Sequence, residues 1–482
     1  MTTLVTEQKK VESASDNIAL KGFCAAPWVE AVLYNSGHLL TCCRNSRIFG
    51  NWQEKGLENC WHSEEFQKFR KSIVLGNFPN EECKNCYYNG TSRPLKTELF
   101  TAFHYNAQII NEYFGHKNNV IYDILPQFDL KSASSNTGDV LEKYFTALDD
   151  MERKKVSYPV TVSYAINKLR VIGSIAKAFI QGDLHPPVVG AFRQVELTNR
   201  CNARCVMCPG KYAGTIVNGC ELDERHLKEA FSRTDDIIDF FMNGTEFLFY
   251  KNWQKVADYL VNSGIKLSLS TNGILLSPHN IRYLIDKKIP LKLNISMDGA
   301  TKETLESTRI NVNYDKLLDS IKYLLSYASQ KKHDFYISFS FVLMKKNYHE
   351  LPQLIKLAGN LMNGKRCPNF NKLVRKTGNF LKGLQYPVIT KLVRFAGLFF
   401  KRLRYPSVSV LCQALETYNV KTYREFVYEQ HHTLIEKEKL KDVFKKALHE
   451  STKAGVRVEV FYSYGIEDFI KQDFPFPPLV KQ

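Results

Sequence analysis

The second half of the chain alternates short apolar runs with amphipathic segments, and this pattern predicts its secondary structure. The apolar runs have the length of strands, and the segments between them carry apolar residues at helical spacing. Strands are predicted at 193–197, 237–242, 266–270, 291–297, 335–343, 407–411 and 456–461, and helices at 223–233, 252–263, 278–287, 314–329, 348–361 and 440–454. This order predicts an α/β fold with parallel strands, and we expect a partial (β/α)6 barrel.

A cysteine-rich loop follows the first of these strands. Cys201, Cys205 and Cys208 are spaced C-x3-C-x2-C, so one loop offers three thiolates. A cubane iron–sulfur cluster normally takes four cysteine ligands, and three local ligands leave one iron open. Structural zinc is the alternative, with Cys220 as the fourth ligand.

Polar residues follow the next three strands of the predicted sheet. They are Asn243-Gly244-Thr245-Glu246, Ser270-Thr271-Asn272-Gly273, and Ser296-Met297-Asp298-Gly299 followed by Arg309. Binding sites in such folds gather at the carboxyl ends of the strands. Asn-Gly and Asp-Gly are first of all turn sequences, so each segment alone also has a structural interpretation. Together, after the cysteine loop, the three segments indicate one binding site.

The cysteine loop and these strand ends resemble the radical S-adenosylmethionine (radical SAM) enzymes over about residues 190–360. In that family SAM binds the open iron of a [4Fe–4S] cluster and is cleaved to a 5′-deoxyadenosyl radical, which abstracts hydrogen from the substrate. The resemblance implies a TIM-like partial barrel, a cluster on the three cysteines, and an electron donor such as a flavodoxin or ferredoxin. It also implies SAM contacts for Met207, Gly244, Thr245, Glu246, Ser270, Asn272, Ser296, Asp298 and Arg309. Thr245 departs from the family, which has glycine there.

The N-terminal region contains a second group of cysteines. The predicted ligands are Cys24, Cys42, Cys83 and Cys86, with Cys43 as an alternative to Cys42. Alternation over 29–40, with a turn at Asn35-Ser36-Gly37, predicts a hairpin that brings the first two cysteines together. The C-x2-C pair then completes a four-thiolate site. Four thiolates at these spacings also suit a zinc ribbon.

This N-terminal segment resembles the SPASM or twitch auxiliary-cluster domains that accompany many radical SAM enzymes. The resemblance continues through residues 57–66 and Phe69-Arg70. It implies a small α+β domain with a second [4Fe–4S] cluster, and one such cluster only, because residues 87–100 contain no further cysteine. The family usually places this module after the barrel, whereas here it comes first.

The whole chain is predicted to have six parts. They are a mobile tail at 1–20, the auxiliary-cluster domain at 21–92, a partly helical connector at 93–189, the barrel at 190–362 and 407–465, a basic insertion at 363–406, and a C-terminal tail at 466–482. The clear helical piece of the connector is 164–181. The absence of a signal pattern, together with clustered cysteines, indicates a reducing compartment, and we expect the cytoplasm.

The basic insertion carries most of the positive charge. Between Lys365 and Arg404 lie eleven Lys or Arg and no Asp or Glu, in a chain of formal net charge +17. Residues 388–405 have Phe and Leu on one helical face and Lys and Arg on the other, which suits peripheral contact with an anionic inner membrane surface. A packed helix with a solvated basic face is the alternative. Nucleic acid is not favoured, because the chain has no recognised binding module.

The sequence therefore predicts a radical SAM enzyme, an oxidoreductase-type catalyst whose substrate no residue identifies. A peptide or protein is expected first, then a carbohydrate or lipid-linked molecule, then RNA. A hypothesis from another class is a non-catalytic iron–sulfur or zinc protein that binds a partner at a membrane surface.

Overall fold

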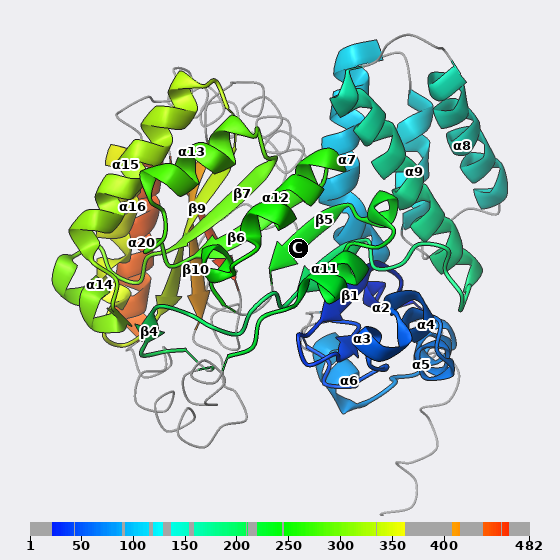
Figure 1. Ribbon diagram of the computed structural model, residues 1–482, viewed down its shortest axis with the longest axis horizontal. Helices are drawn as coiled ribbons and strands as arrows, with labels where there is room; N and C mark the ends of the chain where they lie inside the picture. Colours follow the sequence, from blue (N-terminus) through cyan, green and yellow to red (C-terminus); the bar gives the residue numbers. More distant parts are fainter. Residues whose placement is uncertain are drawn as a thin grey trace, which may run out of the picture.

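The computed structural model describes most of the chain (Figure 1). The described residues are 22–42, 44–88, 92–114, 119–128, 136–153, 159–208, 210, 219–242, 245–333, 335–361, 407–414, 437–454 and 456–461. The predicted tails and basic insertion lie outside them, as do Gly244 and Cys43. Among the helices that are described, none has the length and hydropathy needed to cross a bilayer.

A nine-stranded sheet in the order β11-β10-β9-β7-β6-β5-β3-β1-β2 forms the centre of the molecule. The strands are β1 Glu30–Leu33, β2 Leu39–Leu40, β3 Phe192–Val195, β5 Asp239–Met242, β6 Lys266–Thr271, β7 Leu291–Ser296, β9 Tyr336–Leu343, β10 Ser407–Ala414 and β11 Arg457–Phe461. All neighbours are parallel except β2, which pairs antiparallel with β1. The predicted barrel strands are confirmed, with ends shifted by a few residues.

Helices connect the parallel strands, as the alternating pattern predicts. They are α11 Glu224–Ala230, α12 Trp253–Asn262, α13 Pro278–Asp286, α14 Lys302–Thr308, α15 Tyr314–Gln330, α16 Leu351–Leu361 and α20 Lys437–Ala454. Short 3-10 turns lie at η2 Thr234–Asp236, η3 Phe247–Phe249 and η4 Tyr348–Glu350. Side chains cap several helices: Ser277, for example, accepts the backbone N–H of Asn280 at the start of α13.

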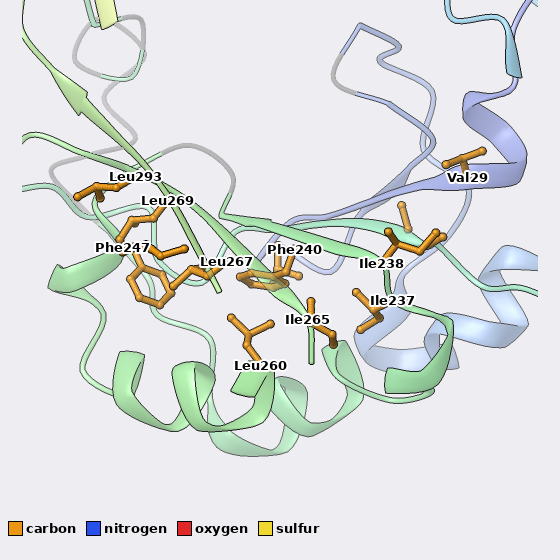
Figure 2. Packing of buried hydrophobic residues seen from close by; sticks show 14 of the residues in the cluster. Val29, Ile237, Ile238, Phe240, Phe247, Leu260, Ile265, Leu267, Leu269 and Leu293 are labelled. Atoms are coloured by element: carbon orange, nitrogen blue, oxygen red, sulfur yellow. The ribbon is translucent and has the colours of Figure 1, made fainter. Parts of the chain in front are cut away.

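The two faces of the sheet differ in polarity. On one face, Leu260 of α12 packs beneath Phe240 and Leu267, all fully buried (Figure 2). On the opposite face, polar side chains of neighbouring strands bind one another. Lys266 pairs with Asp239 at 2.8 Å, Asn294 donates to Ser270 at 3.3 Å, and Ser338 donates to Asn294 at 3.0 Å. The sheet thus has an apolar face under helices and a polar face that remains partly accessible.

The auxiliary domain extends this sheet, which the sequence did not predict. Besides the hairpin it contains α2 Ala26–Val29, α3 Trp52–Lys55, α4 Leu57–Trp61, α5 Glu64–Val74 and α6 Glu81–Tyr88. Its strand β1 pairs in parallel with β3, the first barrel strand. Gly190, with φ of +56°, permits this approach, because a Cβ there would lie 2.5 Å from the Cβ of Ala31.

The connector is more helical than predicted. It contains α7 Leu95–Phe114, η1 Asn119–Phe128, α8 Thr137–Arg153 and α9 Val160–Gln181, of which the prediction named only the last. In α7 the residues Leu95, Leu99, Phe103, Ala107 and Ile110 are buried and recur at helical spacing. The pattern for this helix was therefore present in the sequence.

Candidate active site and auxiliary cysteine site

The cysteine loop at the carboxyl end of β3 is held by a small second sheet. Its strand β4, Arg204–Cys205, pairs antiparallel with β8, Arg309–Ile310, so that Cys205 lies opposite Arg309. The backbone N–H of Val206 donates to Thr308 at 2.9 Å, and that of Cys208 donates to Cys205 at 3.2 Å. The three predicted ligands therefore lie on a fixed loop at the edge of the sheet where sites of this fold gather.

The three thiols of this loop are free and close enough to influence one another. Burial raises the pKa of Cys201 to about 11, and the charge of Cys205 adds to this shift. Burial also raises the pKa of Cys205, and Cys208 contributes in the same direction. A thiol must lose its proton to bind a metal, and the burial of Cys201 and Cys205 opposes this loss until a cation is present.

Three N–H groups donate to these sulfurs. The backbone N–H of Ala203 and the side-chain amide of Asn272 lie 3.5 and 3.6 Å from the Sγ of Cys201. The guanidinium Nη1 of Arg309 lies 3.3 Å from the Sγ of Cys205. Asn272 follows β6 and Arg309 belongs to β8, so other strand ends contribute to the surroundings of the loop.

Glu246 joins the loops after β5 and β6. Its carboxylate is 1% exposed and accepts the Thr271 hydroxyl and the backbone N–H of Asn272, each at 2.8 Å. Burial raises the pKa of Glu246 to about 7, against the opposing effect of these hydrogen bonds. The neighbouring Thr245 donates its hydroxyl to the carbonyl of Thr198, in the chain that leads to the cysteine loop.

Asp298, which follows β7, is completely buried. Its Oδ1 accepts the backbone N–H of Val342 at 2.6 Å, and its Oδ2 forms an ion pair with Nε of Arg309 at 2.5 Å. The side chain of Asn347 donates to the carbonyl of Asp298 at 2.9 Å. Burial raises the pKa of Asp298, while Arg309 opposes that shift.

The structure brings most of the predicted SAM-contacting residues to one edge of the sheet. Glu246 and Asn272 lie with Cys201, and Asp298 and Arg309 lie with Cys205. Thr245 contacts Thr198, ahead of the cysteine loop. Met207 is buried in the loop itself, whereas Ser270 and Ser296 lie on the polar face of β6 and β7. Gly244 lies outside the described residues. The contacts of this set with SAM stay predictions.

The four predicted auxiliary cysteines also come together. Cys24 precedes α2, Cys42 follows β2, and Cys83 and Cys86 belong to α6. Burial raises the pKa of Cys24 to about 11, and Cys86 acts on it in the same direction. Burial likewise raises the pKa of Cys83 to about 12, with contributions from Cys24 and Cys86, and the pKa of Cys42 well above its usual value, with a contribution from Cys24. The predicted hairpin is confirmed, and Cys60 is a buried core residue.

Sequence reasoning missed the polar residues around this second group. Asn45 donates its side-chain amide to the Sγ of Cys83 at 3.4 Å. The guanidinium of Arg93 forms ion pairs with Glu30 of β1 and Glu98 of α7, and Gln194 of β3 donates to Glu30. No local motif marks these residues, because apart from the pair Arg93–Glu98 each contact joins residues that are distant in the sequence.

An open cavity of about 380 Å³ lies in the auxiliary domain. Its lining includes His38, Arg44, Asn45 and Glu82, so side chains of both charges face it. Asn45 is also the donor to Cys83, which places the cavity next to that sulfur.

The donor set at both places fits an iron–sulfur cluster. None of the seven predicted cysteine ligands forms a disulfide, and thiolates are the ligands that such clusters take. N–H groups donate to three of the sulfurs. In the described part of the chain, no three His, Cys, Asp or Glu side chains are arranged as the ligands of a single metal ion. The fit to a cluster therefore rests on the thiol ligands and on the position of the loops that carry them.

Comparison with known proteins finds two family models in the chain. Residues 195–358 match the radical SAM superfamily, and residues 24–87 match SPASM, described as an iron-sulfur cluster-binding domain. These matches confirm the predicted resemblance, the order of the two domains, and the cofactors that it implies: a [4Fe–4S] cluster with SAM, and an auxiliary iron–sulfur cluster. They do not support the zinc alternatives.

Individual relatives match only part of the chain. The AdoMet-dependent heme synthase of Methanosarcina barkeri is 28% identical over 172 residues, 34% of this chain and 46% of that protein. The antilisterial bacteriocin subtilosin biosynthesis protein AlbA of Bacillus subtilis is 20% identical over 167 residues, 34% of this chain and 36% of that protein. Among solved structures, Streptococcus suis SuiB bound to precursor peptide SuiA has a TM-score of 0.40 at 10% identity, covering 72% of this chain and 66% of that chain. The chain spans less than half the length of these two curated relatives.

Proposed function

Because residues 195–358 form a radical SAM domain and residues 24–87 a SPASM domain, we propose that this protein is an enzyme that cleaves SAM reductively and abstracts hydrogen from a peptide or protein. The observation that carries the proposal is the loop with Cys201, Cys205 and Cys208 at the carboxyl end of β3. Its sulfurs lie beside buried polar side chains from three other strand ends, as a cofactor site at this edge requires.

The residues of the site have separate roles in this proposal. When bound, the cluster supplies the electron for SAM cleavage and its open iron holds SAM. Glu246 connects the loops after β5 and β6. Its carboxylate is the group expected to accept hydrogen bonds from the amino group of SAM. Met207 provides an apolar surface within the loop. Cys24, Cys42, Cys83 and Cys86 hold the auxiliary cluster, and a flavodoxin or ferredoxin is the expected electron donor.

A peptide or protein substrate is supported by two observations. The polar face of the sheet offers amide, hydroxyl and charged groups that suit the hydrogen-bonding groups of a peptide. The matched AlbA is named as a biosynthesis protein of a bacteriocin. A small-molecule substrate is the second candidate, because the relative with 28% identity is named as a heme synthase.

The test of SAM chemistry uses the whole chain, reconstituted anaerobically with iron and sulfide. We expect about eight irons per chain, and 5′-deoxyadenosine after addition of SAM and dithionite. Cys205→Ala should abolish 5′-deoxyadenosine and leave the auxiliary cluster spectrum intact. Cys220→Ala is the matched control, since this exposed cysteine lies outside both ligand sets. Bound zinc without cleavage, or undiminished cleavage by the Cys205 variant, would contradict the proposal.

The substrate class needs its own test. Peptides carrying deuterium on carbon are supplied with SAM, and the deuterium content of the recovered 5′-deoxyadenosine is measured by mass spectrometry. Deuterium in this product would support a peptide substrate, because the radical takes the hydrogen that it abstracts. Transfer from a deuterated porphyrin or sugar, and not from peptides, would instead favour the small-molecule class.

We also propose peripheral membrane contact through the basic insertion, within a cytoplasmic protein. The support is the charge and pattern of 365–404, which lie outside the described residues. Flotation with anionic vesicles is the test. Equal flotation of the full chain and of a variant without 365–405 would contradict this contact.

A further inference from the structure

Arg309 lies between a buried carboxylate and a sulfur of the cysteine loop. Its Nε is 2.5 Å from Oδ2 of Asp298, and its Nη1 is 3.3 Å from Sγ of Cys205. Arg309 and Cys205 are each 9% exposed, and Asp298 is 0% exposed. The guanidinium therefore makes both contacts in a place from which most water is excluded.

Several elements fix this guanidinium. The pairing of β4 with β8 sets Arg309 directly opposite Cys205. Asp298 is held in turn by the backbone of Val342 in β9 and by the side chain of Asn347. The contact between Arg309 and the sulfur of Cys205 is thus fixed by the strand pairing and by Asp298.

A charged donor at this distance changes how readily a cluster on Cys205 accepts an electron. Reduction adds negative charge to the cluster, and hydrogen bonds to its sulfurs are among the factors that set its potential. At low exposure the interaction is weakly screened, although the charge of Asp298 offsets part of it. Asn272, the side-chain donor to Cys201, is neutral and more distant at 3.6 Å.

We propose that Arg309, oriented by Asp298, raises the reduction potential of the catalytic cluster through its hydrogen bond to Cys205. The inference rests on the proposed function, because it requires a cluster on the three loop cysteines. Arg309 is here a positioning residue that acts through a sulfur ligand. This role is separate from the SAM contact that the family resemblance implies for the same side chain.

The experiment is an EPR-monitored redox titration of the reconstituted full chain without SAM. The signal of the catalytic cluster is identified by its loss in Cys205→Ala. For Arg309→Gln we expect about a tenfold smaller ratio of reduced to oxidised cluster at a fixed potential, a shift of about 59 mV for one electron. Arg309→Lys, which keeps the charge, should lie between this variant and the wild type. Arg204→Gln is the control, because Arg204 is an exposed residue of β4, the strand that carries Cys205.

Omitting SAM separates the two possible roles of Arg309. A residue that only binds SAM leaves the potential unchanged when SAM is absent, so an unchanged potential in Arg309→Gln with full iron content would overturn the inference. Failure of the proposed function looks different, because the Cys205-dependent signal would then be missing from the wild type. If Arg309→Gln does not fold, wild type labelled with ¹⁵N-arginine decides the matter. Pulsed EPR should show a ¹⁵N coupling to the catalytic cluster, and its absence would overturn the inference.

Discussion

The two groups of cysteines are assembled in opposite ways. Cys201, Cys205 and Cys208 come from one loop, and side chains from other strand ends surround them. The auxiliary cysteines come from the start of α2, the end of β2 and the helix α6, so the folded domain itself gathers them. The candidate catalytic site is therefore a local motif placed at a sheet edge, whereas the candidate auxiliary site is assembled by the tertiary structure.

The buried charges beside the two sites differ as well. Arg309 and Asp298 form a pair of opposite charges next to Cys205. At the auxiliary site two carboxylates, Glu30 and Glu98, share Arg93. Burial raises the pKa of Glu30 to about 7 and also raises the pKa of Glu98, and the charge of Arg93 opposes both shifts. The auxiliary surroundings thus carry an excess of negative charge when both carboxylates are ionised.

The largest expected effect comes from removing one ligand at each site. Cys83→Ala should lose about four irons and the auxiliary signal, yet still form 5′-deoxyadenosine, because SAM binds at the other loop. Cys205→Ala should show the reverse pattern. Iron content, EPR spectra and 5′-deoxyadenosine measured on both variants check this independence. Loss of both signals in either single variant would show that the two sites do not assemble separately.

The fold of the barrel could be predicted because its signals are local. Each strand, such as 266–270, is a short apolar run, and the polar strand ends with Glu246 and Asp298 follow from the chain order. The parallel pairing of β1 with β3 could not be predicted, since it joins residues about 160 apart through backbone hydrogen bonds, which any residue can form. The helix α7 could have been found from its buried apolar spacing.

The candidate site divides along the same line. Spacing identified Cys201, Cys205 and Cys208, and the family resemblance identified Arg309 as a functional residue. That Arg309 contacts the sulfur of Cys205, and that Asp298 holds it, depends on the pairing of β4 with β8. Contacts of this kind connect distant residues without a repeating pattern, so only the folded chain shows them.

The second prediction concerns the shared arginine of the auxiliary site. Arg93→Met removes the cation from two buried carboxylates, and breaking a buried ion pair in this way costs about 3–5 kcal/mol. The destabilisation should be smaller at pH 5.5 than at pH 8, because carboxylates of raised pKa are protonated in acid. We also expect the auxiliary cluster to be lost more readily than the catalytic one. Thermal unfolding at both pH values and EPR of the two clusters measure these effects.

Arg47→Met is the matched control for this variant. Arg47 pairs with Glu65, but their side chains are 40% and 54% exposed, and such surface pairs contribute about 0–1 kcal/mol. The two ion pairs of Arg93 would contribute no more to the free energy of unfolding than a surface pair if Arg93→Met is no less stable than Arg47→Met at pH 8.

The smallest expected effect concerns Glu246 in the catalytic half. Its pKa is raised by burial to about 7 from 4.5, so the folded protein binds more protons than the unfolded chain between these values. The contribution of Glu246 to stability is therefore fully present below pH 4.5 and is lost as the pH rises through 7. The loss is roughly 3 kcal/mol, at 1.36 kcal/mol for each pKa unit.

Glu246→Gln should remove this dependence, because its amide resembles the protonated acid and does not titrate. Relative to the wild type, the variant should gain stability as the pH rises from 5 to 8, measured by thermal unfolding of the cluster-free chain. Asp319→Asn is the control, since Asp319 is 76% exposed on α15 and should leave the pH profile unchanged. Parallel profiles for Glu246→Gln and the wild type would mean that water or another cation reaches this carboxylate. The likeness between Glu246 and Glu30 would then be lost, because only the auxiliary site would hold a carboxyl group whose pKa is raised to about 7.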